Sequence, residues 1–123
     1  MFAVIQRADV RNQLARLSRS GCRVRIVTSR DTVENWLQRS LPAGDIPDRM
    51  VRTVLTHDKM LVVNARFRGR ATHLVVTGTS NTTCGGLLYN DEVMLRIVGN
   101  RWLHDQYRAH FDDAYARARQ SRS

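Results

Sequence analysis

A histidine and a lysine lie two residues apart near the middle of the chain, in His57-Asp58-Lys59. Lys59 is the only lysine among the 20 basic side chains, and all the others are arginines. A compact ammonium and a planar guanidinium are not interchangeable beside a reacting phosphate. A histidine can act as a nucleophile at phosphorus, and an ammonium can neutralise the phosphate oxygens. We therefore interpret His57 and Lys59 as a candidate catalytic pair for phosphoryl chemistry.

Further polar groups follow downstream, in Gly78-Thr79-Ser80-Asn81 and at Glu92. Gly78 is expected to permit a tight turn at a strand end, where the following hydroxyl and carboxamide groups project. Glu92 is expected to open the next strand. If these strands are neighbours, an imidazole, an ammonium, hydroxyls, a carboxamide and a carboxylate converge at one end of a sheet. This set supplies a nucleophile, a positive clamp, neutral donors and a group that orients the histidine.

Alternating strands and helices are predicted to position these groups, which indicates an α/β class with a mixed β-sheet flanked by helices. Apolar or alternating runs predict strands over residues 2–5, 22–27, 59–63, 72–77 and 92–98. The runs at 59–63 and 72–77 are nearly continuous, which favours central strands that are covered on both faces. The stretch 42–47 between two prolines is predicted to be a loop.

Helical spacing of apolar residues predicts three helices, ending with one over residues 101–119 and including a short one over 32–41. The first helix is expected to have Asp9 as its N-cap and to end at Gly21. The inner stripe of the last helix is predicted to consist of Leu103, Tyr107, Phe111, Ala114 and Ala118.

The length of 123 residues allows a single domain, residues 1–123. The formal net charge of +9 favours polyanionic partners, either a nucleic-acid backbone or an anionic membrane surface. No stretch approaches the ~18–20 apolar residues of a membrane span, and the run at 2–5 is too short for a signal peptide. A cytoplasmic location and secretion as part of a longer precursor both stay open.

The motif set resembles the phospholipase D superfamily, whose signature is His-x-Lys-x4-Asp followed by Gly-Ser/Thr-x-Asn. The matching residues are His57-x-Lys59, Gly78-Thr79-Ser80-Asn81 and Glu92, and the flanking segments 21–27, 90–93 and 107–111 are also similar to bacterial members. The resemblance implies a phospholipase D-like half-domain that cleaves phosphodiesters without a metal or another cofactor. Because the chain begins inside an element, we expect the half-domain to be truncated at its N-terminus.

The resemblance also implies residue roles. His57 would form a phosphohistidine, Lys59 and Asn81 with Thr79 would bind the phosphate oxygens, and Glu92 would accept a hydrogen bond from the imidazole. A second histidine, from a second copy of the motif, would protonate the leaving alkoxide. This chain holds one copy, so a homodimer or a partner half-domain is expected to complete the site. Phospholipid and nucleic acid both stay open as substrates.

Asn64 departs from the family pattern, because it occupies the position of the aspartate that follows the lysine. An asparagine can still form hydrogen bonds but carries no charge, so we expect a supporting role and a lower efficiency. Asn64 and the abrupt start also support an alternative, a catalytically inactive basic module that binds nucleic acid or an anionic membrane.

The remaining candidates are read as structural. Cys22 and Cys84 lack metal-type spacing, so buried free thiols are expected, although one disulfide is compatible with export. His73 is expected to be structural, and His104 and His110 are predicted on different faces of the last helix, with no metal site. The arginines at 66, 68 and 70 predict an exposed hairpin turn that could contact a polyanion. Trp36 and Trp102 are expected in the core or in helix packing, and not as stacking platforms.

Overall fold

The computed structural model describes residues 8–28, 50–79 and 91–120. In chain order they form α1 (Ala8–Arg19), β1 (Ile26–Thr28), β2 (Val51–Thr53), β3 (Met60–Phe67), β4 (Arg70–Gly78), β5 (Met94–Val98), α3 (Arg101–Arg117) and β6 (Arg119–Gln120). The elements predicted at 2–5, 32–41 and 42–47 lie outside the described residues, as do Trp36, Asn81 and Cys84.

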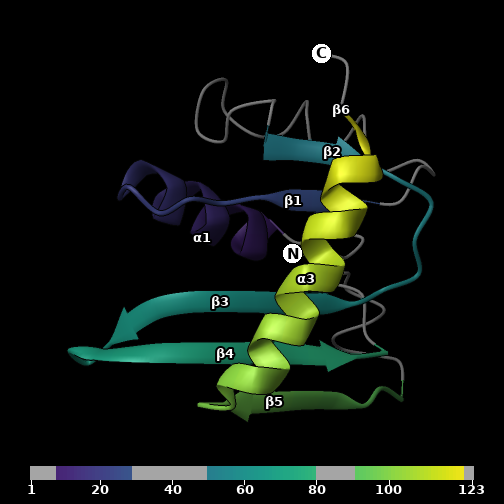
Figure 1. Cartoon of the computed structure of the whole chain (residues 1–123). Helices are drawn as coiled ribbons and strands as arrows, with labels where there is room; N and C mark the ends of the chain where they lie inside the picture. The colour runs from purple at the N-terminus through teal and green to yellow at the C-terminus, as the bar shows by residue number, and fades with distance from the viewer. Residues whose placement is uncertain (1–7, 29–49, 80–90, 121–123) are drawn as a thin grey trace.

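The strands form two three-stranded sheets, β1-β2-β6 and β3-β4-β5. β1 and β2 are parallel, with Ile26 opposite Val51, whereas β6 and all strands of the second sheet pair antiparallel. Figure 1 shows the sheets one above the other, with α3 crossing the front of both. The predicted mixed sheet with flanking helices is thus confirmed, while the strand β2 was not predicted.

A two-residue turn joins β3 to β4, with Phe67 opposite Arg70. Arg68 and Gly69 both have positive φ, 49° and 77°, which is the backbone of a type I′ hairpin turn. The predicted exposed arginine turn is therefore confirmed. Of the two runs predicted to form central strands, 72–77 lies in β4 at the centre of its sheet, whereas 59–63 leads into β3 at the edge of that sheet. Met60 is buried and residues 61–63 are half-buried, while the residues from Asn64 onward are exposed because they extend beyond α3.

The core lies under α3, where Phe111 and Ala114 pack with Val27 of β1 and Met60 of β3. Tyr115 stacks on Phe111 with ring centroids 5.9 Å apart. The predicted inner stripe of the last helix is confirmed, because Phe111, Ala114 and Ala118 are buried while Leu103 and Tyr107 are half-buried. The helix therefore joins the two sheets through apolar contacts, and burial of this area stabilises the fold.

Both helices have defined ends. Gly21, at φ +92°, follows α1, and Cys22 N–H donates to Leu17 O in the six-to-one bond of a Schellman motif. Gly21 thus ends the helix as predicted, but α1 starts at Ala8, so Asp9 lies in its first turn and is not the N-cap. At α3, the side chain of Asn100 caps the helix by accepting Leu103 N–H at 2.9 Å.

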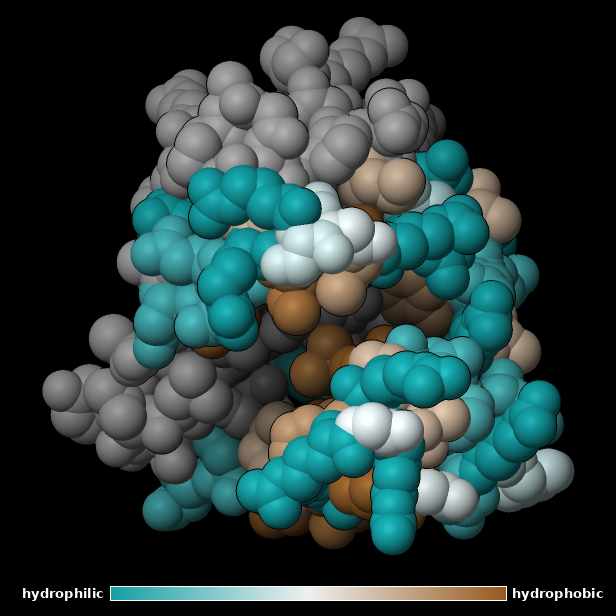
Figure 2. Space-filling model, turned by 90° about the vertical axis from the view of Figure 1, so that its left-hand side faces the viewer, coloured by the Kyte–Doolittle hydropathy of each residue, from teal (hydrophilic) through white to brown (hydrophobic). Residues whose placement is uncertain are grey.

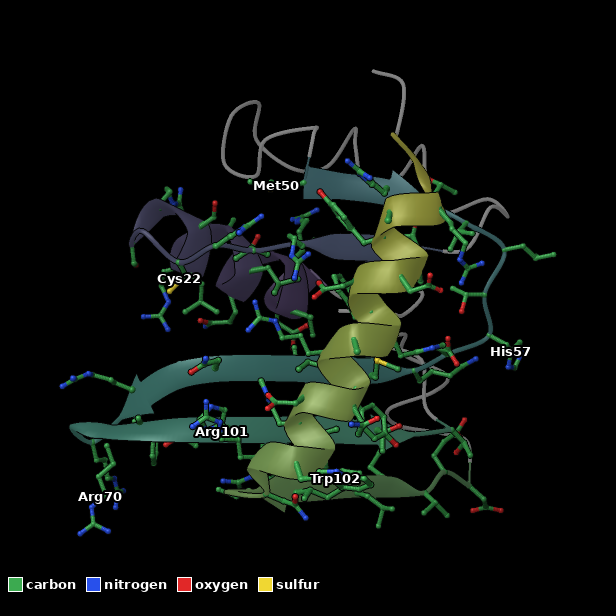
Figure 3. The ribbon with its side chains drawn as sticks, in the orientation of Figure 1. Cys22, Met50, His57, Arg70, Arg101 and Trp102 are labelled. Carbon is green, nitrogen blue, oxygen red and sulfur yellow. The ribbon has the colours of Figure 1, made fainter. Side chains whose placement is uncertain are left out.

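Three sequence-based expectations need correction. The strand predicted at 22–27 begins only at Ile26, because its partner β2 is three residues long. Cys22 is exposed, since it lies in the cap that follows α1 and outside any strand. Trp102 is 71 % exposed and not in the core, because it lies beside the inner stripe and not on it (Figure 3).

Candidate active site

His57 and Lys59 lie in the segment that leads from β2 into β3, and Lys59 directly precedes the strand. The ammonium of Lys59 lies 3.0 Å from His57 Nδ1 and 2.6 Å from the His57 carbonyl oxygen. This contact agrees with the expectation that both side chains lie on the same side of the sheet. His57 is exposed at the end of the sheet opposite the β3–β4 turn (Figure 3).

The backbone of Lys59 is held by the end of β4. Its carbonyl oxygen accepts the Gly78 N–H at 3.3 Å and the Thr77 hydroxyl at 3.2 Å. These bonds fix the position of the lysine relative to the neighbouring strand. The Gly78-Thr79 segment and the His57-Lys59 segment therefore meet at one sheet end, as expected for neighbouring strands.

Gly78 is required for a reason other than the expected tight turn. Among the described glycines, Gly21, Gly69 and Gly99 have a positive φ. Gly78 does not, so a left-handed backbone is not the reason for a glycine at this position. A Cβ atom built on Gly78 would lie 2.0 Å from the Val93 carbonyl oxygen and 2.9 Å from Met94 Cα. The glycine thus permits the close approach of β4 and the segment before β5.

Thr79 connects this approach to the predicted carboxylate. Its hydroxyl donates to Glu92 Oε2 and accepts the Val93 N–H at 3.0 Å, while its own N–H donates to Val93 O at 2.9 Å. Glu92 lies two residues before β5 and does not open the strand itself. A hydrogen bond from the His57 imidazole to Glu92 stays a prediction, and Asn81 lies outside the described residues.

An aspartate and a second histidine, which sequence reasoning did not assign to the site, complete this end of the sheet. His110 Nε2 on α3 lies 2.8 Å from Asp58 Oδ2, and the Thr56 hydroxyl donates to the same carboxylate oxygen at 3.0 Å. Burial raises the pKa of Asp58, but the hydrogen bonds from His110 and Thr56 outweigh it, so the pKa lies below its ordinary value. The pair attaches the His57–Lys59 segment to α3.

A pocket of about 420 Å³ lies at this end of the sheet. Its lining combines the His57–Lys59 segment, the end of β4 and one side of α3: His57, Asp58, Lys59, Met60, Thr77, Gly78, Gln106, Tyr107 and His110. Across residues 8–28, 50–79 and 91–120, no group of three or more histidine, cysteine or acidic side chains could hold a metal ion. None of the described helices is long and apolar enough to cross a membrane.

Asn64 is separate from this pocket. It lies exposed on β3, beyond the part of the strand that borders His57 and Lys59, and lines a second pocket with Arg23, Arg25 and Arg108. Its side chain therefore belongs to a different part of the molecule from the predicted catalytic pair. Because Asn64 does not line the His57–Lys59 pocket, an asparagine in place of the family's aspartate removes no charge from that pocket.

Comparisons with known proteins agree with the family resemblance and with the fold. The family model described as cardiolipin synthase, phospholipase D-like domain, matches residues 1–115. The chain belongs to the phospholipase D-like family. A solved structure, Nuc, a phospholipase D family member from Salmonella typhimurium, superimposes on this phospholipase D-like chain with a TM-score of 0.79. The two sequences are 22 % identical, and the match covers 99 % of this chain and 78 % of Nuc. No curated protein matches the chain.

Proposed function

We propose that this phospholipase D-like chain hydrolyses phosphodiesters through a phosphohistidine formed on His57. The observation that carries the proposal is the contact of the Lys59 ammonium with the His57 imidazole, 3.0 Å apart at a pocket of about 420 Å³. The hydroxyl of Thr77 and the backbone of Gly78 hold Lys59 in place. A rigidly held ammonium can neutralise a phosphate without reorganisation during the reaction.

The first step forms a bond from an imidazole nitrogen to phosphorus and breaks the bond from phosphorus to the leaving oxygen. Lys59 donates to Nδ1 in the structure, so the neutral His57 ring carries its proton on Nε2. When a substrate phosphate takes the ammonium, Nδ1 is released and can carry the proton instead, which leaves Nε2 as the nucleophile. Glu92 is the expected acceptor of that Nδ1 proton, and Asn81 with Thr79 is expected to bind phosphate oxygens.

The leaving alkoxide needs a proton, and we assign its donor to His57 of a second copy. A twofold homodimer with the two sites at its axis places two such imidazoles around one phosphate, and bound substrate then gives them opposite roles. The second imidazole later removes a proton from the water that cleaves the phosphohistidine, which restores both rings. A partner half-domain with its own motif would serve the same purpose.

The test is hydrolysis of bis(4-nitrophenyl) phosphate in the presence of EDTA, comparing the wild type with His57→Ala. We expect activity that survives chelation and falls on the order of a thousandfold or more in the variant. Acid-free quenching should trap a 4-nitrophenyl phosphoryl group on His57, and light scattering should give the mass of two chains. An equal background rate of hydrolysis with both proteins would refute the proposed enzymatic activity. Loss of the wild-type activity in EDTA would indicate a metal-dependent nuclease.

The substrate class needs a separate comparison. Anionic phospholipid vesicles and single-stranded DNA, supplied to the wild type and to His57→Ala, distinguish lipid cleavage from nuclease activity. The inactive basic module stays the alternative, supported by the net charge of +9. It predicts binding to one of these polyanions that is the same in both proteins, with no product from either.

A further inference from the structure

A second pocket, of about 240 Å³, lies where α3 faces the middle of β3 and the segment before β1. Its lining is Arg23, Arg25, Val62, Asn64, His104, Arg108 and Phe111, and none of these residues lines the His57–Lys59 pocket. Figure 2 views the molecule from the side of the β3–β4 turn, where hydrophilic side chains surround a recess with hydrophobic residues at its base. Three guanidinium groups thus converge on a cavity away from the proposed catalytic pair.

Positive charge exceeds negative charge in this pocket. Asp112 is the carboxylate that pairs with its arginines, 2.7 Å from Arg25 and 3.7 Å from Arg108. Arg23 has no acidic partner among the described residues. Asn64, which stands where the family signature has an aspartate, adds a carboxamide and no charge. An anion from outside the chain would balance the excess charge.

His104 supplies a buried ring nitrogen that lacks a partner among the described residues. Its side chain is 2 % exposed, its Nδ1 lies 3.1 Å from Asp105 Oδ1, and its ring packs edge-on against His73 at 4.8 Å. Within the described part of the chain, its buried Nε2 has no hydrogen-bond partner. Native structures rarely leave a buried nitrogen unpaired unless a water, an ion or a ligand completes it. Protonation of the ring would give Nε2 a hydrogen that it could donate to an anion in the pocket.

We propose that this pocket binds a phosphate group, held by the guanidinium groups of Arg23 and Arg108 and by the His104 imidazolium. A planar guanidinium donates two parallel hydrogen bonds to phosphate oxygens, which makes arginine the preferred side chain for such sites. Arg25 is fixed by Asp112 and contributes mainly its charge. The site is independent of the chemistry proposed at His57, since it needs no catalytic residue.

The test uses the full chain, labelled with ¹⁵N and carrying Lys59→Met, so that the first pocket lacks its ammonium. Titration with inorganic phosphate should shift the His104 ring signals and saturate. Arg23→Gln, an exposed change that spares the core, should raise the Kd about tenfold. Arg70→Gln is the matched control, because it removes the same charge from the tip of the β3–β4 hairpin (Figure 3). Unmoved His104 signals, or equal weakening by both variants, would overturn the proposal.

A pH series tests the role of the imidazolium. The charge of sulfate is constant over the pH range in which histidine side chains titrate. Tighter sulfate binding at pH ~5.5 than at pH ~8 therefore reports protonation of a histidine ring at the site. His104→Gln should bind weakly and lose this dependence, and its ¹⁵N spectrum shows whether it folds. The titratable and charged groups around the His104 ring are His73 on β4, Arg23 and Arg25 before β1, and Asp105, Arg108 and Asp112 on α3. A pH dependence retained in His104→Gln would contradict the assignment.

A last titration replaces inorganic phosphate with a short single-stranded oligonucleotide. Shifts of the same His104 signals at lower ligand concentration identify a phosphodiester of a polymer as the bound group. Shifts with inorganic phosphate alone identify a free phosphate. Both results support a phosphate site in this pocket, whereas an oligonucleotide that binds while the His104 signals stay unmoved in both titrations refutes it.

Discussion

Substitution of Gly78 by alanine tests how tightly the proposed active site depends on backbone packing. The added Cβ would lie 2.0 Å from the Val93 carbonyl oxygen, whereas ordinary contacts begin at 3.4 Å. The collision involves backbone atoms, which cannot rotate away as a side chain can. The segment before β5 must therefore move by about 1 Å or more, and overpacking of this kind costs about 1–3 kcal/mol.

This displacement reaches two predicted site residues. The Val93 carbonyl accepts the Thr79 N–H, and the Gly78 N–H donates to Lys59 O, so movement on either side changes the positions of Lys59 and Thr79. We expect Gly78→Ala to lower Tm by about 4–12 °C. Misplacement of catalytic groups by ~1 Å can cost about a hundredfold, and we expect a loss of kcat of that order.

Thermal melts followed by circular dichroism give the stability, and bis(4-nitrophenyl) phosphate hydrolysis gives kcat. Gly99→Ala is the control, because Gly99 has φ +79° and no atom within 4 Å of an added Cβ. It should lose about 1 kcal/mol from backbone strain and keep its kcat. A Gly78→Ala protein with unchanged Tm and kcat would refute the reasoning, as would an equal loss of kcat in Gly99→Ala.

Two further predictions concern α3. Asp58→Asn should cost about 0.2–1 kcal/mol at neutral pH, since the carboxylate and His110 are both partly exposed, and a double-mutant cycle with His110→Gln measures the coupling. Because the Asp58 pKa is lowered in the fold, this stability is present above the ordinary carboxyl range and is lost as pH falls through the folded value, so the two proteins should converge only at a pH below the ordinary carboxyl range. Phe111 is 4 % exposed, so Phe111→Ala leaves a cavity in the core and should lower the free energy of unfolding, measured in urea, by about 3–5 kcal/mol. A decrease of less than about 1 kcal/mol would contradict the assigned core.

Local patterns in the sequence predicted the features that depend on neighbouring residues. The 3.6-residue spacing placed Phe111 and Ala114 on the buried stripe of the last helix, and Gly21 marked the end of the first. The spacing of two placed His57 and Lys59 on one side of the strand entry. Each of these inferences needs only the geometry of a single element.

Tertiary structure alone decided the features that join distant parts of the chain. Asp58 and His110 are 52 residues apart, and no local spacing relates them. Gly78 is needed because of a carbonyl group on another segment, and the second pocket brings Arg23 of the segment before β1 together with His104 of α3. Periodicity tells which way a side chain points within its own helix or strand, but which element it meets is determined by how the sheets and α3 pack.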